Sequence, residues 1–106
     1  MPIVLNAWDP RNNNVVMYEE RYLEHIVTGH PGIEIDDIRE TIEHPDFITD
    51  DETKDLVEIY YKHGVVPFAP DNYLKVCVLV DSDKGKVRTA YLVHHPKPTE
   101  RISWKP

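Results

Sequence analysis

Two histidines at neighbouring positions are the first residues in this sequence whose chemistry stands out. His25 and His30 lie five residues apart, and imidazole titrates near neutral pH, which suits it to proton transfer. Pro31 disfavours helical backbone at His30 and holds that imidazole in a turn, where solvent reaches it. His30 is therefore the better candidate for a general acid or base. His25 falls on an apolar stripe, where a buried, hydrogen-bonded histidine is the alternative to a second proton donor.

Arg88 and Thr89 form the second candidate group, with Lys62 as a neighbour from another strand. A guanidinium, an ammonium and a hydroxyl together bind a phosphate and stabilise the charge that develops on it. Cleavage of RNA by its own 2′-hydroxyl requires such groups. Because strand alternation separates Arg88 from Thr89, both reach one site only at a strand end, a sheet edge or a bulge. The alternative interpretation is a solvated strand face.

Metal binding is a third interpretation, through His25 and His30 or through His94 and His95. The first pair is not on one helical face, and no HExxH motif or Cys/His pair accompanies it. The single cysteine, Cys77, lies within a strand pattern and is expected to be a small hydrophobic residue. We therefore expect no metal and no cofactor. The histidines expected on the surface, at the ends of elements, are His44, His63, His94 and His95.

The elements that must position these side chains are organised around residues 73–94. Apolar and β-branched residues alternate there on both sides of a polar turn at Asp83, Lys84 and Gly85, which predicts a β-hairpin. Residues 56–63 alternate in the same way and predict another strand of the main sheet. Residues 102–104 are expected to add a last short strand, and residues 47–48 an extended segment.

The N-terminal half predicts one short hairpin and two helices. Residues 3–6 and 15–17 flank a run of turn-forming residues, which is typical of a hairpin. Residues 18–28 space apolar side chains at intervals of three and four and predict an amphipathic helix that ends at Gly29. Ile35, Ile38 and Ile42 predict a second helix, which Pro45 ends.

We therefore expect one α+β domain, residues 1–106, with two N-terminal helices packed on one face of a four-stranded antiparallel sheet and with a short N-terminal hairpin. Strand alternation assigns the sheet residues to two faces. Those expected to face the helices are Val57, Ile59, Tyr61, Leu74, Val76, Val78, Val80, Val87, Thr89, Tyr91 and Val93. Those expected on the open, mostly basic face are Glu58, Tyr60, Lys62, Lys75, Lys86 and Arg88.

Charge is distributed unevenly along the 106 residues, of which 41% are hydrophobic. Residues 1–53 carry three basic and thirteen acidic side chains, whereas residues 54–106 carry nine basic and six acidic ones. The net charge of −7 argues against a general nucleic-acid coat protein, but the basic half is compatible with a local anion site. Without a signal peptide or a membrane span, the expected location is cytoplasmic.

Several segments, in order, resemble the small phage- and toxin-associated nuclease domains of the barnase, EndoU, colicin and RelE-like group. The segments are PIVLNAWDPRNNNVVMYEERYLEHIVTGHPGI, TIEHPDFI, a strand ending IYYKHG, YLKVCVLVD, VRTAYLV and ISW. In that pattern the first helix ends in an HI…HP signature, which here is His25-Ile26 and His30-Pro31. A P-D-x-I segment follows the second helix, and the last strand carries a threonine before a small residue and an aromatic one, here Thr89-Ala90-Tyr91.

The resemblance implies two helices against a four-stranded antiparallel sheet and metal-independent cleavage of RNA. RNA is then the expected partner, and a cognate antitoxin or another protein is a further candidate. The chain departs from the pattern at Gly29, where a basic residue is expected, and at Gly32, where an acidic one is expected. These departures and the acidic half support a rival hypothesis, a non-catalytic domain that binds a protein or an anionic ligand on its sheet.

Overall fold

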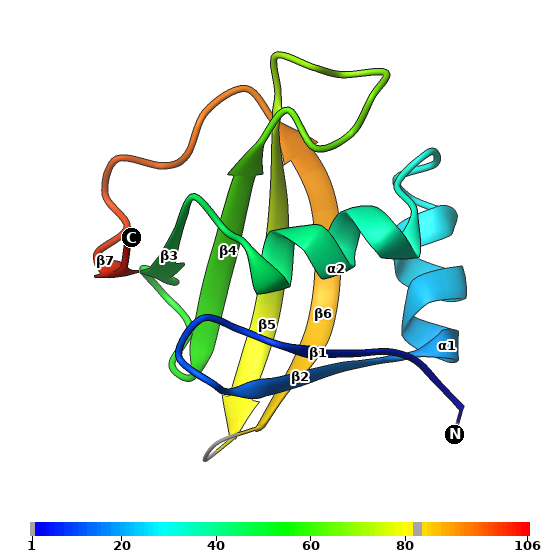
Figure 1. The fold of residues 1–106 in the computed structure, drawn as a ribbon, viewed down its shortest axis with the longest axis horizontal. Coiled ribbons are helices and arrows are strands. Elements are labelled where there is room, and N and C mark those ends of the chain that lie inside the picture. The colour runs from blue at the N-terminus through cyan, green and yellow to red at the C-terminus, as the bar shows by residue number, and fades with distance from the viewer. Residues whose placement is uncertain (1, 82–83) are drawn as a thin grey trace.

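Seven strands form one mixed sheet in the part of the chain that the structure, a computed structural model, describes: residues 2–81 and 84–106 (Figure 1). The strands follow the order β1-β2-β6-β5-β4-β3-β7, and two helices complete the α+β domain. The first helix consists of the consecutive segments α1 and η1. The bounds are β1 Ile3–Trp8, β2 Asn14–Tyr18, α1 Glu19–Arg21, η1 Tyr22–Val27, α2 Ile35–Glu43, β3 Phe47–Asp50, β4 Val57–His63, β5 Tyr73–Asp81, β6 Lys84–Val93 and β7 Ile102–Trp104.

The expected four-stranded antiparallel sheet is wrong in strand count and in arrangement. The predicted N-terminal hairpin is present as β1 and β2, but it joins the main sheet because β2 lies parallel to β6, with residues 14–16 opposite residues 84–86. Gly85 permits this pairing, since a Cβ there would lie 2.6 Å from Cγ1 of Val78 and 3.3 Å from Cγ2 of Val15. At the other edge, β3 and β7 extend the sheet further.

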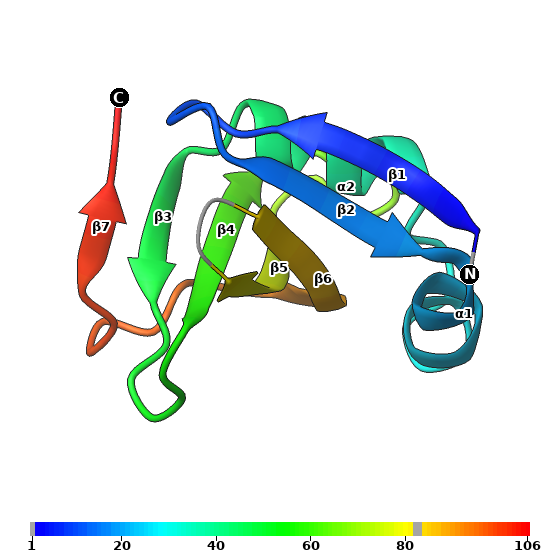
Figure 2. The same ribbon diagram turned by 90° about the horizontal axis from the view of Figure 1, so that it is seen from below.

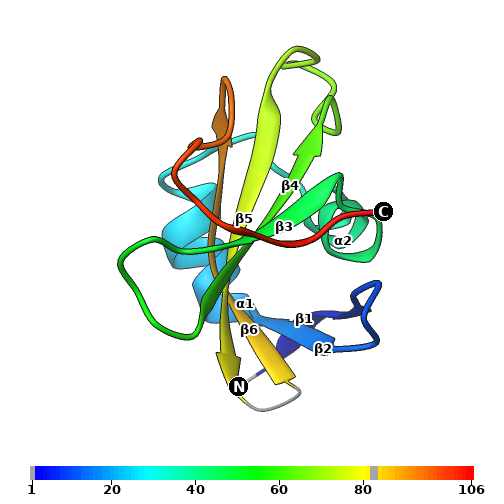
Figure 3. The same cartoon turned by 90° about the vertical axis from the view of Figure 1, so that its left-hand side faces the viewer.

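The hairpin of β1 and β2 folds over the strands β4, β5 and β6 on the same side as α2. The hairpin and α2 therefore cover the same face of these three strands (Figures 2 and 3). Its tip is held against β4 by a compact ionic cluster. The Arg11 guanidinium donates to Asp9 and to Glu58, each at 2.8 Å, and the Tyr60 hydroxyl donates to Asp9 at 2.7 Å. The apolar core fills the space beneath and includes Leu5, Met17, Ile26, Ile38, Ile42, Tyr60, Leu74, Val76 and Val78.

The first helix is shorter and wider than the predicted helix over residues 18–28. Tyr18 ends β2, and η1 is a π-helical segment in which the Thr28 hydroxyl donates to the Leu23 carbonyl, five residues back, at 2.9 Å. The wider turn buries Ile26 and leaves His25 exposed, so the expectation that His25 falls on a buried stripe is wrong. The helix packs against β6, and its Ile26 joins the same apolar core as Ile38 and Ile42 of α2.

The second helix, α2, agrees with the prediction. Ile38 and Ile42 are fully buried, Ile35 is partly buried, and the backbone N–H of Glu34 donates to the Asp37 carboxylate at 3.0 Å at the N-terminus. The helix packs on β1, β4 and β5. It therefore defines a covered face of the sheet and, opposite to it, what we call the open face.

The predicted assignment of residues to the two faces is correct for β5 and for the first part of β6, and it is wrong for β4 and for β6 from Thr89 onward. Strand β4 is reversed: Tyr60 belongs to the core under α2, and Ile59 and Tyr61 lie on the open face. All three side chains are buried, so alternation carried no information about the direction of each. Strand β6 is correct at Val87 and Arg88 and reversed from Thr89 onward, because the bulge at Arg88 shifts the alternation by one residue. The residues that move from the expected covered face to the open face are Val57, Ile59, Tyr61, Thr89, Tyr91 and Val93, and those that move the other way are Glu58, Tyr60 and Lys62.

The central hairpin of residues 73–94 is confirmed as the antiparallel pair β5 and β6. Lys84 and Gly85 belong to β6 rather than to the turn, and the predicted turn residue Asp83 lies outside the described residues. The predicted last strand is confirmed as β7, which pairs with β3. In the described ranges, no helix has the length and apolar character needed to cross a membrane.

Candidate anion-binding site on the open face

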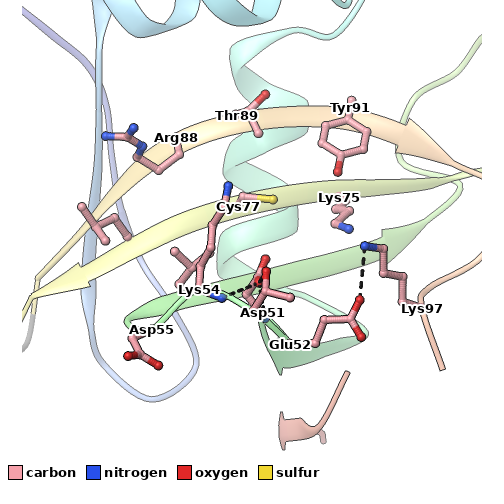
Figure 4. A pocket seen from close by; sticks show the side chains of 13 residues that line it. Asp51, Glu52, Lys54, Asp55, Lys75, Cys77, Arg88, Thr89, Tyr91 and Lys97 are labelled. Atoms are coloured by element: carbon pink, nitrogen blue, oxygen red, sulfur yellow. Dashed lines mark hydrogen bonds and ion pairs between the residues drawn. The ribbon is translucent and has the colours of Figure 1, made fainter. Parts of the chain in front are cut away.

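A cavity of about 660 Å³ lies on the open face, between the β3–β4 loop, strands β5 and β6, and the chain segment that precedes β7 (Figure 4). Its floor is formed by open-face side chains of the strands, and its walls are formed by the loop and by Lys97. The lining residues are Asp51, Glu52, Thr53, Lys54, Asp55, Val57, Lys75, Cys77, Leu79, Arg88, Thr89, Tyr91 and Lys97.

A bulge in β6 brings two predicted site residues to this cavity. Val78 pairs with Val87, whereas the adjacent Cys77 pairs with Thr89, so Arg88 is an extra residue in its strand. Arg88 and Thr89 therefore both line the cavity, although regular alternation would place them on opposite faces. The sequence predicted that Arg88 and Thr89 share a site only at a strand end, a sheet edge or a bulge, and the structure has a bulge there.

A row of aromatic and basic side chains crosses the open face. Phe47, Tyr61, Lys75 and Tyr91 are paired in succession across β3, β4, β5 and β6. The Lys75 ammonium lies 5.8 Å from the ring centroid of Tyr61 and 5.5 Å from that of Tyr91. The row continues beyond the sheet, because the His30 ring stacks on Tyr91 with the centroids 5.2 Å apart. His30 therefore lies beside the cavity, separated from it by Tyr91.

Lys75 is the most buried cation of the cavity, with its side chain 6% exposed. Its ammonium lies 3.6 Å from the Glu100 carboxylate. Burial alone would lower the pKa of Lys75, but the nearby Tyr91 oxygen and Glu100 outweigh it, so the pKa lies above its usual value. Lys75 is therefore a permanent positive charge in the cavity at neutral pH.

The other charged groups divide into paired and unpaired ones. Glu52 pairs with Lys97 at 3.5 Å, and Asp51 accepts backbone hydrogen bonds from Thr53 and Lys54 that lower its pKa. Lys54, Arg88 and Asp55, which also line the cavity, form no ion pair with another described residue. These two cations are available to an anionic ligand.

Lys62 and His25 are not brought to this cavity. Lys62 lies on the covered face, where its ammonium donates to the His44 carbonyl at 2.7 Å and pairs with Asp46 at 3.8 Å. His25 is exposed on the first helix and lines a separate hollow of about 130 Å³ with Tyr18. Of the five predicted site residues, the structure therefore gathers three: Arg88 and Thr89 within the cavity and His30 beside it.

The sequence interpretation missed Lys75 and Tyr91 as site residues. Lys75 interrupts an otherwise apolar strand, and such a lysine is a signal of a functional or paired charge. Tyr91 was assigned to the wrong face because of the bulge. The contributions of Lys54, Lys97 and Glu100 depend on the approach of two distant loops, for which the sequence offers no local signal.

Metal binding has no counterpart in the described residues, among which no group of three or more His, Cys, Asp or Glu side chains is arranged to hold a metal ion. Cys77 lies at the cavity floor, where burial raises the pKa of its thiol. The thiol is therefore protonated at neutral pH and is a poor nucleophile.

No protein-family model, curated protein or solved structure matches this chain. The resemblance to the barnase, EndoU, colicin and RelE-like group therefore stays a prediction.

Proposed function

We propose that this chain binds the phosphate backbone of RNA in the open-face cavity and cleaves it without a metal ion. The observation that supports the proposal is the bulge at Arg88, which brings a guanidinium and the Thr89 hydroxyl to a cavity that also holds the Lys75 ammonium. Groups of this kind bind phosphate and stabilise the negative charge that develops on it during displacement.

In the proposed reaction, His30 is the proton-transfer group. A base removes the proton of the ribose 2′-hydroxyl, whose oxygen attacks the phosphorus and displaces the 5′-oxygen, which takes up a proton. The products are a 2′,3′-cyclic phosphate and a 5′-hydroxyl. Arg88 and Lys75 hold the phosphate, and Thr89 orients one of its oxygens. Lys62 and His25 have no part in this arrangement, because they lie away from the cavity.

The second candidate function is non-catalytic binding of an anionic ligand in the same cavity. It is favoured by the position of His30, which among the described histidines is the one beside the cavity and whose ring is already stacked on Tyr91. A single imidazole supplies one of the two proton transfers, so the second would need another group.

Incubation of labelled RNAs with the purified chain in EDTA tests the proposal. We expect cleavage that leaves 2′,3′-cyclic phosphate ends, and we expect His30→Ala to reduce it by roughly a hundredfold or more. His25→Ala is the matched control, because it removes an exposed imidazole from the helix that precedes His30, away from the cavity, and it should retain full activity.

The outcomes separate the two candidates. RNA binding that depends on Arg88, without cleavage, supports the non-catalytic function. Full cleavage by a folded His30→Ala chain contradicts the role of His30. Neither binding nor cleavage across a broad set of RNAs contradicts the RNA-cleavage proposal, and absence of inorganic phosphate binding as well contradicts the second candidate.

A further inference from the structure

Glu100 is a buried carboxylate that reaches onto the open face from outside the sheet. Its side chain is 1% exposed, although it belongs to an irregular segment near the C-terminus. Its carboxylate accepts hydrogen bonds from the Thr49 hydroxyl at 3.0 Å and from the Tyr61 hydroxyl at 2.5 Å, and it lies 3.6 Å from the Lys75 ammonium. Burial of a carboxylate is costly without such partners.

The three partners are themselves a preformed receptor for an anion. Thr49, Tyr61 and Lys75 belong to the adjacent strands β3, β4 and β5, so the sheet fixes their relative positions. The two hydroxyl groups donate to Oε1 of the carboxylate, and the ammonium lies 3.6 Å from Oε2, so the three groups surround one carboxylate. This donor set matches the oxygens of a phosphate group as well as it matches a carboxylate.

The segment that carries Glu100 is held mainly by contacts at the surface. We call residues 96–101 the C-terminal strap. Lys97 and Thr99 both contact Glu52, and Arg101 pairs with Asp50 at 3.2 Å with its own side chain 84% exposed. Ion pairs this exposed contribute little to stability. Glu100 is therefore the buried attachment of the strap, and the end of the strap beside β7 is also held by the Asp50 N–H, which donates to the Arg101 carbonyl at 2.9 Å.

The strap and the cavity are connected through two lysines. Lys97 of the strap forms part of the cavity wall, and Lys75, which pairs with Glu100, lines the cavity floor. Glu100 therefore neutralises the most buried cation of the cavity. A phosphate that enters the cavity and the Glu100 carboxylate compete for the same ammonium.

We propose that Thr49, Tyr61 and Lys75 form a phosphate site, that Glu100 occupies it as an internal ligand, and that a phosphate group replaces the Glu100 carboxylate when the C-terminal strap opens. This inference deepens the proposed function, on which it relies for the arrival of a phosphate-bearing ligand in the cavity. Phosphate binds only to chains in which the strap is open. The measured affinity for phosphate is therefore the affinity of the open state multiplied by the fraction of chains that are open.

Thermal unfolding of Glu100→Gln in inorganic phosphate is the first test. The substitution keeps the size of the side chain and removes the charge, so Lys75 lacks its counter-charge. Phosphate at ten times its Kd should raise the melting temperature of this variant by about 5 °C relative to sodium chloride of equal ionic strength. The parent chain should show a much smaller shift.

Two further variants serve as controls. Glu58→Gln weakens a partly buried ion pair with Arg11 on the covered face, away from the cavity, so phosphate should not restore its stability. Lys75→Met combined with Glu100→Gln should lose the phosphate effect. An equal phosphate shift in Glu100→Gln and Glu58→Gln, or a shift that persists without Lys75, would overturn the proposal.

Arg101→Met tests the strap without altering the cavity lining, and it serves if Glu100→Gln does not fold. It removes the ion pair between the strap and Asp50. We expect amide hydrogen exchange of Asp50, whose N–H donates to the Arg101 carbonyl, to become roughly threefold faster. The affinity for inorganic phosphate should rise by the same factor, since both depend on the open population. Faster exchange with unchanged affinity contradicts the competition.

These measurements use no RNA and leave His30 intact, so they separate this inference from the proposed function. One outcome is that Glu100→Gln binds phosphate through Lys75 while the parent chain neither binds nor cleaves RNA. This outcome refutes the proposed function and supports the inference. The other outcome is that the parent chain cleaves RNA but phosphate does not raise the melting temperature of Glu100→Gln. This outcome refutes the inference alone.

Discussion

Removal of the Arg11 side chain should detach the N-terminal hairpin from β4 and destabilise the whole domain. The guanidinium bridges Asp9, whose side chain is fully buried, and Glu58, which is 16% exposed. Loss of one partner from a buried ion pair costs about 3–5 kcal/mol, and the partial exposure of Arg11 and Glu58 places Arg11→Met near 3 kcal/mol. For a domain of this size, that corresponds to a fall in melting temperature of about 12 °C.

The pH dependence of this loss follows from the pKa of Asp9. Burial of Asp9 favours its protonated form, but hydrogen bonds from Tyr60, Asn13 and Arg11 outweigh burial and lower the pKa below its usual value. A carboxyl whose pKa is lowered by folding contributes stability above its unfolded pKa of about 3.9, and this contribution is lost as the pH falls through the folded pKa. The difference between the parent and Arg11→Met should therefore be largest at neutral pH and shrink below about pH 4.

Urea unfolding monitored by circular dichroism between pH 7 and pH 3 measures both effects. Arg39→Met is the control, because Arg39 and Glu43 form a more exposed pair at 4.0 Å whose loss should cost less than about 1 kcal/mol. A loss below 1 kcal/mol in Arg11→Met, or the same loss at pH 3 as at pH 7, would refute this account of the hairpin.

Three further outcomes follow from the fold and the cavity. Gly85→Ala should destabilise the domain by about 1–2 kcal/mol, since its Cβ would lie 2.6 Å from Val78 of β5 and 3.3 Å from Val15 of β2, and calorimetry should show it; no loss would contradict the close approach of these strands at Gly85. Ile42→Ala should cost about 2–5 kcal/mol in urea unfolding, because the side chain is fully buried in the core; a loss under 1 kcal/mol would contradict that packing. Arg88→Ala should weaken RNA binding and reduce the slope of log affinity against log salt by about 1, whereas the exposed Lys105→Ala should change neither; equal effects would refute a specific contact at Arg88.

Local patterns predicted the elements of this chain well and their assembly less well. The alternation of residues 73–94 and the isoleucine spacing of α2 led directly to elements that the structure confirms. The parallel pairing of β2 with β6 was not predictable in the same way. It depends on a close approach at Gly85 between segments far apart in the sequence.

Residue types in the sequence predicted part of the candidate site and missed the rest. Arg88 and Thr89 were predicted as partners on condition of a bulge or a similar irregularity, and the bulge is present. Strand β4 was misassigned because Ile59, Tyr60 and Tyr61 are all buried, so no polar face marks its orientation. That error placed Lys62 on the open face, and it concealed the contact between Tyr61 and the Glu100 carboxylate.

The most direct test of the central claim is a titration of the isotope-labelled chain with a short RNA that carries a non-cleavable 2′-deoxy linkage, followed by nuclear magnetic resonance. We expect the largest chemical-shift changes at Lys75, Arg88, Thr89 and Tyr91 and in the β3–β4 loop, with little change in α2. Changes concentrated on α2 or on the β1–β2 hairpin, or no changes at all at low salt, would contradict an RNA site on the open face.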